Sequence, residues 1–226
     1  MTDAGTRRPI VIAHRHGNDL ALLGEAARAG AAFVEADVWA YRGRLEVRHA
    51  KTLGPTPLIW DRWYVRRRPA RPLVLEEVLA ALPAGMGIMI DLKGSDRRLP
   101  EMLLSALQGH GGAGPVMVSA RFWDHLPSLR AHPELTLFHS VGSAGQLRRV
   151  RPLLELREND AISIHYQLLD ATTVRSLKGQ VSMVATWPIN DEERLREVVG
   201  WGVDAAITDS LDIVKNALAK GIGGRI

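Results

Sequence analysis

The chain contains no cysteine, which excludes disulfide bonds and catalysis by a thiolate. No apolar run approaches the roughly 20 residues that a helix needs to span a bilayer. No glycine-rich phosphate-binding loop follows the first predicted strand. Residues 1–9 lack the apolar region of a secretory signal, and we therefore expect a cytoplasmic protein without a transmembrane segment.

The composition indicates one enzyme-sized domain. With 226 residues, 46% of them hydrophobic, the chain can bury a large core and has the size of a single α/β barrel. We find no linker or low-complexity tract and expect one domain over residues 1–226. The net charge of +4 favours anionic ligands only mildly.

Short apolar strands alternate with amphipathic helices along the whole chain. The predicted strands are 9–14, 33–39, 87–93, 116–119, 135–140, 161–166, 181–187 and 205–208. The predicted helices are 20–29, 75–81, 100–108, 122–131, 144–156, 171–177, 191–200 and 212–220, with Asp170 and Asn190 as N-caps of two of them. Eight such units predict a (β/α)8 TIM barrel of the α/β class. An open doubly wound sheet is the alternative, but it usually has fewer strands and a glycine-rich loop after the first.

Chemically active residues gather at the predicted carboxyl ends of these strands, where barrel enzymes carry their active sites. They are His14, Arg15, Glu35, Asp37, His49, Asp91, Lys93 and Trp187. His49 closes a further strand-like segment, 44–49, in the loop after the second strand.

The spacing of the acids indicates a metal site. Side chains alternate along a strand, so Glu35 and Asp37 point the same way, and Asp91 shares a face with Lys93. Crowded carboxylates repel one another unless a cation joins them. The alternative is that these are surface acids paired with the many arginines.

The ordered motifs resemble the glycerophosphodiester phosphodiesterase family over nearly the whole chain. They are IAHR (12–15), VEADV (34–38), VRH (47–49), DLK (91–93), WPIN (187–190) and GVDAAITD (202–209). The resemblance implies a barrel phosphodiesterase that uses one divalent cation, Mg²⁺ or Ca²⁺. It also implies that Glu35, Asp37 and Asp91 bind the metal, that His14 and His49 are the acid–base pair, and that Arg15 and Lys93 hold the phosphate.

The chain departs from the family pattern in the segments that shape substrate choice. The Glu-Asn-Thr segment that usually follows the first motif is missing, and Ala50 stands where an aspartate usually follows the second histidine. The insertion after His49 is short. An aspartate before Leu92-Lys93, as found here, also resembles the motif of the related sphingomyelinase D branch.

The chemistry that these residue types support is phosphodiester cleavage. A cation held by three acids would neutralise charge on a phosphoryl group, while Arg15 offers a fork of donors and Lys93 a point charge. One histidine would take a proton from the attacking oxygen and the other would protonate the leaving group. A neighbouring substrate hydroxyl would attack first, giving a cyclic phosphate. Trp187 would wall the pocket.

The segment 60–71 combines aromatic residues with arginines beside this site. It could contact a lipid surface or headgroup, or form a solvated loop whose tryptophans pack on the barrel. We expect no nucleic-acid binding, and oligomeric state is left open.

Three hypotheses follow from the sequence. The first is cleavage of small glycerophosphodiesters. The second is lysophospholipase D- or sphingomyelinase D-like cleavage of intact lysolipids or sphingolipids. The third is a non-catalytic barrel that binds phosphate esters.

Overall fold

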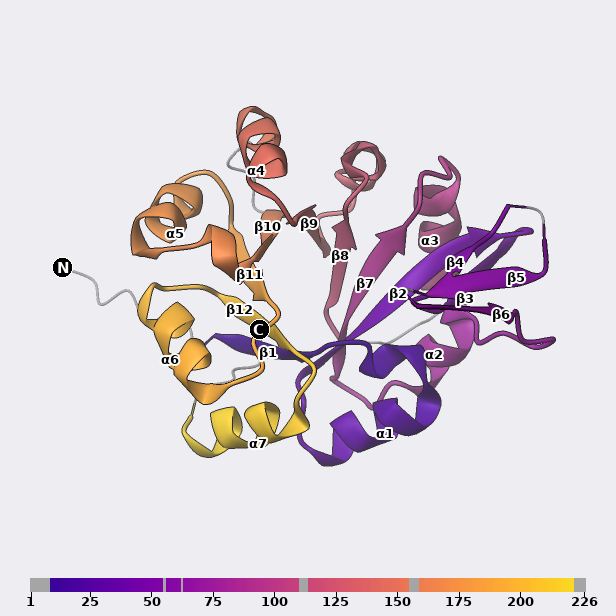
Figure 1. Cartoon of the computed structure of the whole chain (residues 1–226), viewed down its shortest axis with the longest axis horizontal. Coiled ribbons are helices and arrows are strands. Elements are labelled where there is room, and N and C mark those ends of the chain that lie inside the picture. The colour runs from indigo at the N-terminus through magenta and orange to yellow at the C-terminus, as the bar shows by residue number, and fades with distance from the viewer. Residues whose placement is uncertain (1–8, 55, 62, 110–113, 155–158, 222–226) are drawn as a thin grey trace.

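Eight parallel strands form a closed barrel in the computed structural model, which describes residues 9–54, 56–61, 63–109, 114–154 and 159–221 (Figure 1). Neighbouring barrel strands follow chain order, and the barrel closes because β1 pairs with both β12 and β2. The strands are β1 (Ile10–Ala13), β2 (Phe33–Tyr41), β7 (Gly87–Lys93), β8 (Val116–Ala120), β9 (Leu135–Val141), β10 (Asp160–His165), β11 (Met183–Trp187) and β12 (Ala205–Thr208). The predicted TIM barrel is confirmed.

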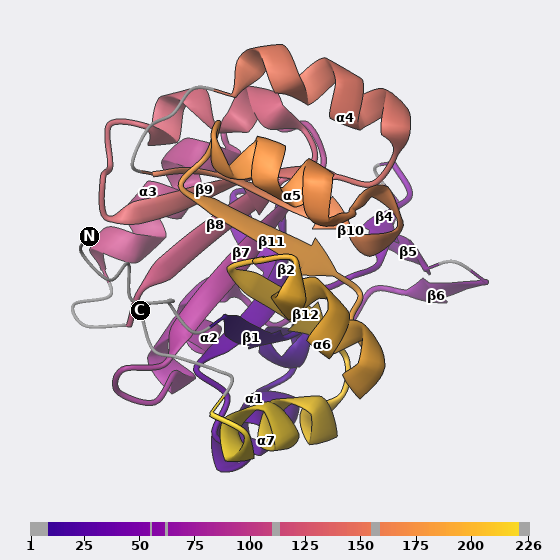
Figure 2. The same cartoon turned by 90° about the vertical axis from the view of Figure 1, so that its left-hand side faces the viewer.

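Seven α-helices lie outside the barrel strands in the described ranges (Figures 1 and 2). They are α1 (Leu20–Arg28), α2 (Leu75–Ala81), α3 (Leu99–Gln108), α4 (Ala144–Val150), α5 (Ala171–Lys178), α6 (Glu192–Gly200) and α7 (Leu211–Ala219). Their apolar sides pack against the outward-facing residues of the strands in one large core. None of these helices is both long and apolar enough to cross a bilayer.

The helix predicted over 122–131 is wrong. Two short 3₁₀ turns, η2 (Trp123–His125) and η3 (Pro127–Leu129), connect β8 to β9 instead. Pro127 lacks the amide hydrogen that an α-helix would need at this point, and its ring opposes a continuous helix through the preceding turn.

Two further helix ends differ from the prediction or fall outside the described residues. Asp170 caps α5 as predicted, since its carboxylate accepts from the Thr173 amide at 2.6 Å. Asp191, and not Asn190, caps α6. The helix predicted over 144–156 ends at Val150, continues as the 3₁₀ turn η4 (Arg151–Leu153), and its last two predicted residues lie outside the described ranges.

The chain between β2 and α2 builds a small sheet on the edge of the barrel. The strand-like segment predicted over 44–49 is β3 (Arg44–Val47), which pairs antiparallel with β2. A separate three-stranded antiparallel sheet follows, made of β4 (Lys51–Thr52), β5 (Leu58–Asp61) and β6 (Tyr64–Arg67). Sequence periodicity did not predict this sheet, because its strands are short and mostly exposed.

The barrel interior is closed below the site by apolar side chains. Phe33, Met89, Met117 and Phe138 are its large members, and each is at most 2% exposed. Gly87 makes room for the Phe33 ring, because a Cβ at Gly87 would lie 2.1 Å from it. This packed floor leaves the carboxyl ends of the strands as the place for polar chemistry.

Candidate active site

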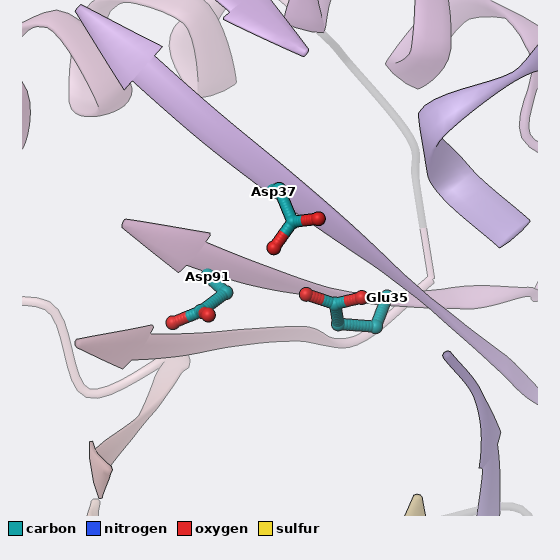
Figure 3. Close-up of side chains that lie close together, drawn as sticks. All are labelled: Glu35, Asp37 and Asp91. Carbon is teal, nitrogen blue, oxygen red and sulfur yellow. The ribbon is translucent and has the colours of Figure 1, made fainter. Parts of the chain in front are cut away.

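Three carboxylates from two neighbouring strands converge inside the mouth of the barrel. Glu35 and Asp37 lie on β2 and Asp91 on β7, with Asp37 and Asp91 directly opposite each other in the parallel register. One oxygen from each residue lies within 4.8 Å of the others. Figure 3 shows the three side chains turned toward a common space. The predicted alternation is confirmed, since Val34, Ala36 and Val38 pack in the outer core.

Lys93 lies among these acids. Its Nζ is 2.6 Å from Asp37 Oδ1 and also contacts Asp91. Burial alone would lower the pKa of Lys93, but Asp91, Asp37 and Glu35 outweigh it and raise the pKa well above its usual value. Burial would likewise raise the pKa of Asp37, and Lys93 outweighs it and lowers that pKa. Lys93 and Asp37 are therefore both charged at neutral pH.

Lys93 balances only part of the negative charge of the carboxylate cluster. Burial, with repulsion from Asp37, raises the pKa of Glu35 well above its usual range. Among the described residues, no hydrogen-bond donor contacts the buried atom Asp91 Oδ1, and Asp37 Oδ1 has only the Lys93 ammonium as its partner. When ionised, the three acids and Lys93 carry a net charge of −2. Three converging carboxylates with a net charge of −2, one of them with an oxygen that has no donor, fit a hard divalent cation such as Mg²⁺ or Ca²⁺.

The loop after β1 orients two of these carboxylates. The backbone amide of Arg15 donates to Glu35 Oε2 at 2.8 Å. Asn18 Nδ2 donates to Asp37 Oδ2 at 2.7 Å, and the Asp37 amide donates back to Asn18 Oδ1 at 2.8 Å. Gly17 permits this close approach, because a Cβ there would lie 2.8 Å from the Ala36 side chain. The sequence analysis gives no role to Asn18, and the only signal for it is its place in the altered first motif.

His14 lies at the end of β1, between two carboxylates. Its Nδ1 is 2.6 Å from Asp209 Oδ1, and its Nε2 faces Glu35 Oε2 at 3.8 Å. The hydrogen bond to His14 holds the pKa of Asp209 well below its usual range. Asn190 holds Asp209 in turn, with Nδ2 donating to Asp209 Oδ2 at 3.0 Å. The Asn190 Oδ1, which an N-cap would use, accepts from the Asp209 amide at 2.9 Å instead.

His49 lies just after β3 and has a carboxylate partner of its own. Its Nδ1 is 2.9 Å from Asp61 Oδ1, on β5 of the small sheet. His49 is also close enough to Asp37 to contribute to the lowered pKa of that carboxyl. Sequence analysis missed both Asp61 and Asp209 as site residues. Asp209 stands in the last matched motif. Asp61 lies in the segment 60–71, which the sequence analysis singled out for its aromatic residues and arginines and not for this aspartate.

Arg15 reaches the carboxylates from the same loop. Its Nε lies 3.7 Å from Asp37 Oδ2, and its side chain is one-third exposed toward the mouth. Arg15 has a left-handed backbone conformation (φ 57°), which is uncommon for a side chain of this size. The two predicted phosphate-binding cations, Arg15 and Lys93, therefore both lie beside the acidic cluster.

Trp187 and His165 lie together at the ends of β11 and β10. Their rings pack edge to face with centroids 5.0 Å apart, and Arg121 lies over the Trp187 ring at 5.8 Å. Trp187 is partly exposed, consistent with a wall of the mouth. His16, in the loop after β1, is buried, and its Nδ1 lies within hydrogen-bond distance of the His14 carbonyl, at 2.9 Å.

Known proteins resemble this chain in fold. Comparison with protein-family models gave no match, and comparison with curated protein sequences gave none. Among solved structures, the chain is similar to an Oleispira antarctica phosphodiesterase in complex with its product sn-glycerol-3-phosphate, at 22% identity and a TM-score of 0.75 over 94% of this chain and 97% of that one.

Two glycerophosphodiester phosphodiesterases are also similar. The enzyme from Thermotoga maritima is 21% identical, with a TM-score of 0.68 over 94% of this chain and 98% of that one. The enzyme from Parabacteroides distasonis is 19% identical, with a TM-score of 0.73 over 96% of this chain and 99% of that one. Over nearly its whole length, therefore, this chain has the barrel fold of the glycerophosphodiester phosphodiesterases.

Proposed function

We propose that this protein is a metal-dependent phosphodiesterase that cleaves glycerophosphodiesters to an alcohol and glycerol phosphate. The observation that carries the proposal is the carboxylate cluster of Glu35, Asp37 and Asp91. With Lys93 it carries a net charge of −2 when ionised, and among the described residues no donor contacts the buried Asp91 Oδ1. The fold shared with phosphodiesterases of this kind, one of them bound to sn-glycerol-3-phosphate, supports the same activity.

The three carboxylates would hold one divalent cation, Mg²⁺ or Ca²⁺. A cation there would polarise a phosphoryl oxygen and stabilise the charge that grows during phosphoryl transfer. Asn18 would keep Asp37 oriented, and the Arg15 amide would do the same for Glu35. Substitution of residues that orient metal ligands in this way commonly lowers metal affinity about 10- to 100-fold.

The two histidines would move the protons. Each has one ring nitrogen, Nδ1, beside a carboxylate, which leaves Nε2 of that ring for substrate. One histidine would accept the proton of the attacking hydroxyl and the other would protonate the leaving oxygen, each step contributing about 10²–10⁴ in rate. Arg15 and Lys93 would pair with the phosphate oxygens, and Trp187 would wall the alcohol side.

A hydroxyl next to the ester would be the first nucleophile. Intramolecular attack has effective molarities of roughly 10⁵–10⁸ M, far above the concentration of water. The product of that step is a cyclic phosphate with release of the alcohol, and a second step with water opens the ring. Proton donation and acceptance by His14 and His49 are reversed between the two steps.

The test is turnover of glycerophosphocholine by the whole chain with Mg²⁺, with Ca²⁺ and with chelator. Glu35→Gln should abolish both turnover and divalent-metal binding measured by calorimetry. Glu25→Gln, the same change at an exposed position on α1, should alter neither. Metal-independent turnover, or full activity in Glu35→Gln, would refute the proposal.

Lysophosphatidylcholine tested in parallel separates the second hypothesis from the first. Preference for the lysolipid would identify a lipid phosphodiesterase that uses the same site. Metal binding without product from either diester would favour the phosphate-ester-binding barrel. One catalytic domain over residues 1–226 and a cytoplasmic location stay predictions from the sequence.

A further inference from the structure

We propose that the small sheet β4–β6 docks the protein onto an anionic lipid bilayer. This sheet projects beyond the barrel on the side toward which the β11 arrow points, which is the side of the candidate active site (Figure 2). Asp61, on its strand β5, contacts His49 directly. A surface that holds the sheet would therefore also hold the mouth of the barrel close to that surface.

The sheet exposes an unusual share of the large apolar side chains. Ten such side chains are exposed in the described part of the chain, and five of them lie between residues 58 and 65: Leu58, Trp60, Trp63, Tyr64 and Val65. Trp63 is 93% exposed, which excludes packing against the barrel. A tryptophan in water at the end of a hairpin suits the interface of a bilayer, where its amphipathic ring is stabilised.

One face of the sheet combines these apolar groups with positive charge. Cross-strand neighbours share a face, and the register pairs Lys51 with Trp60, Trp60 with Val65, and Leu58 with Arg67. Ile59, which alternates with these residues, is 1% exposed and turns toward the protein. The outer face thus carries apolar groups beside Lys51 and Arg67.

The charge of the sheet suits anionic lipid headgroups. Asp61 is the only acid between residues 51 and 71, and it faces His49 rather than the outer face. The same stretch contains six basic residues, of which Arg68 and Arg71 pair with Glu46 and Glu77 outside the sheet. Lys51, Arg66 and Arg67 are exposed on the sheet. Each basic residue near an anionic membrane adds a favourable contribution, and apolar groups add burial, so the two act together.

The base of the sheet is anchored, so docking would orient the barrel. Arg68, just after β6, pairs with the fully buried Glu46 of β3 at 2.6 Å. Arg48 donates to Thr52 Oγ1 of β4 at 2.6 Å. The contact surface and the barrel are therefore one connected unit.

Other occupants fit this face less well. A second copy in a two-fold dimer would bring Lys51 and Arg67 against basic groups of the same patch. The one acid of the sheet, Asp61, faces His49 and could not pair with them. A nucleic acid strand could stack on Trp60, but Leu58 and Val65, the other apolar groups of the outer face, offer no ring for the neighbouring bases.

Co-sedimentation with lipid vesicles tests the proposal without requiring enzyme activity. Vesicles of phosphatidylcholine alone are compared with vesicles that also contain phosphatidylglycerol. We expect binding to the anionic vesicles that weakens as salt rises. Trp63→Ala should weaken it at least about tenfold, and the double variant Lys51→Ala/Arg67→Ala about thirtyfold.

The matched control is Arg175→Ala/Arg196→Ala, which removes the same charge from exposed positions on α5 and α6 and should bind like the unmodified protein. Thermal unfolding of each variant shows that it is folded. Absence of binding to anionic vesicles, or equal loss in the control, would overturn the proposal. It would also be overturned by a dimer that Trp63→Ala dissociates, or by tighter binding of a single-stranded oligonucleotide than of vesicles.

Discussion

At the scale of single residues, each candidate catalytic histidine is held by one carboxylate. Asp209 bonds Nδ1 of His14 and Asp61 bonds Nδ1 of His49, at 2.6 and 2.9 Å. Such a bond fixes the ring orientation and the tautomer that presents Nε2 to substrate. We therefore predict that these aspartates act through the histidines, as positioning residues.

Asp61→Asn and Asp209→Asn should each lower kcat at least about tenfold while KM changes little, because the histidine loses its preferred tautomer but the phosphate site is intact. Steady-state kinetics on glycerophosphocholine measures both constants. Asp212→Asn, at a side chain that is 85% exposed, is the control and should match the unmodified protein. A change confined to KM in the two variants would contradict a positioning role.

At the scale of elements, an ion network joins the β4–β6 sheet to the barrel. The fully buried Glu46 accepts from Arg48 and from Arg68, and the Arg68 guanidinium also covers the Tyr41 ring at 4.5 Å. A buried charge that loses its partner costs far more than a surface pair.

Glu46→Gln should lower the free energy of unfolding by about 3 kcal/mol, because it leaves two buried or partly buried guanidinium groups without their carboxylate. Urea denaturation followed by circular dichroism measures this change. Glu77→Gln, which breaks the surface pair with the 89% exposed Arg71, should have little effect. Equal losses of stability in the two variants would contradict a larger cost for unpairing the buried charges around Glu46.

Gly87 shows how one position on a strand sets the packing of the barrel floor. A Cβ at Gly87 would lie 2.1 Å from the buried Phe33 ring, so Gly87→Ala should destabilise the protein by about 1–3 kcal/mol. Gly200→Ala, at the end of α6 with open space around it, should not destabilise it. Urea denaturation compares the two, and Phe33→Leu combined with Gly87→Ala should recover part of the loss.

At the scale of the whole molecule, stability should depend on pH through a buried histidine. His139 is 2% exposed, and burial lowers its pKa, so the folded state favours the neutral ring. The unfolded chain binds a proton more readily, with a pKa of about 6.5. The contribution of His139 to the free energy of unfolding is therefore complete above about pH 6.5. It decreases as the pH falls from there toward the lowered pKa of the folded state.

His139→Asn keeps a donor close to the place of Nδ1, which bonds the Ala161 carbonyl, but removes the titrating ring. Urea denaturation at neutral and mildly acidic pH should show a smaller loss on acidification for this variant than for the unmodified protein. His132→Asn, at a partly exposed histidine, should leave the pH dependence unchanged. An identical loss in His139→Asn and in the unmodified protein would assign the pH dependence to other groups.

The amino-acid sequence by itself determined the barrel and the acidic cluster. Alternation along a strand is a local property, so the shared face of Glu35 and Asp37 on β2, and of Asp91 and Lys93 on β7, followed from spacing alone. The helix predicted over 122–131 is wrong because Pro127 interrupts the helical hydrogen bonds, and two short 3₁₀ turns form there although the apolar periodicity suggested a helix.

Only the tertiary structure decided the partners of the histidines and the shape of the insertion. Asp209 is 195 residues from His14, and barrel closure through β1 and β12 brings them together. Asp61 reaches His49 because β4–β6 fold back beside the site. Such contacts join segments that carry no shared local pattern, and they form only when the whole sheet closes and the core packs.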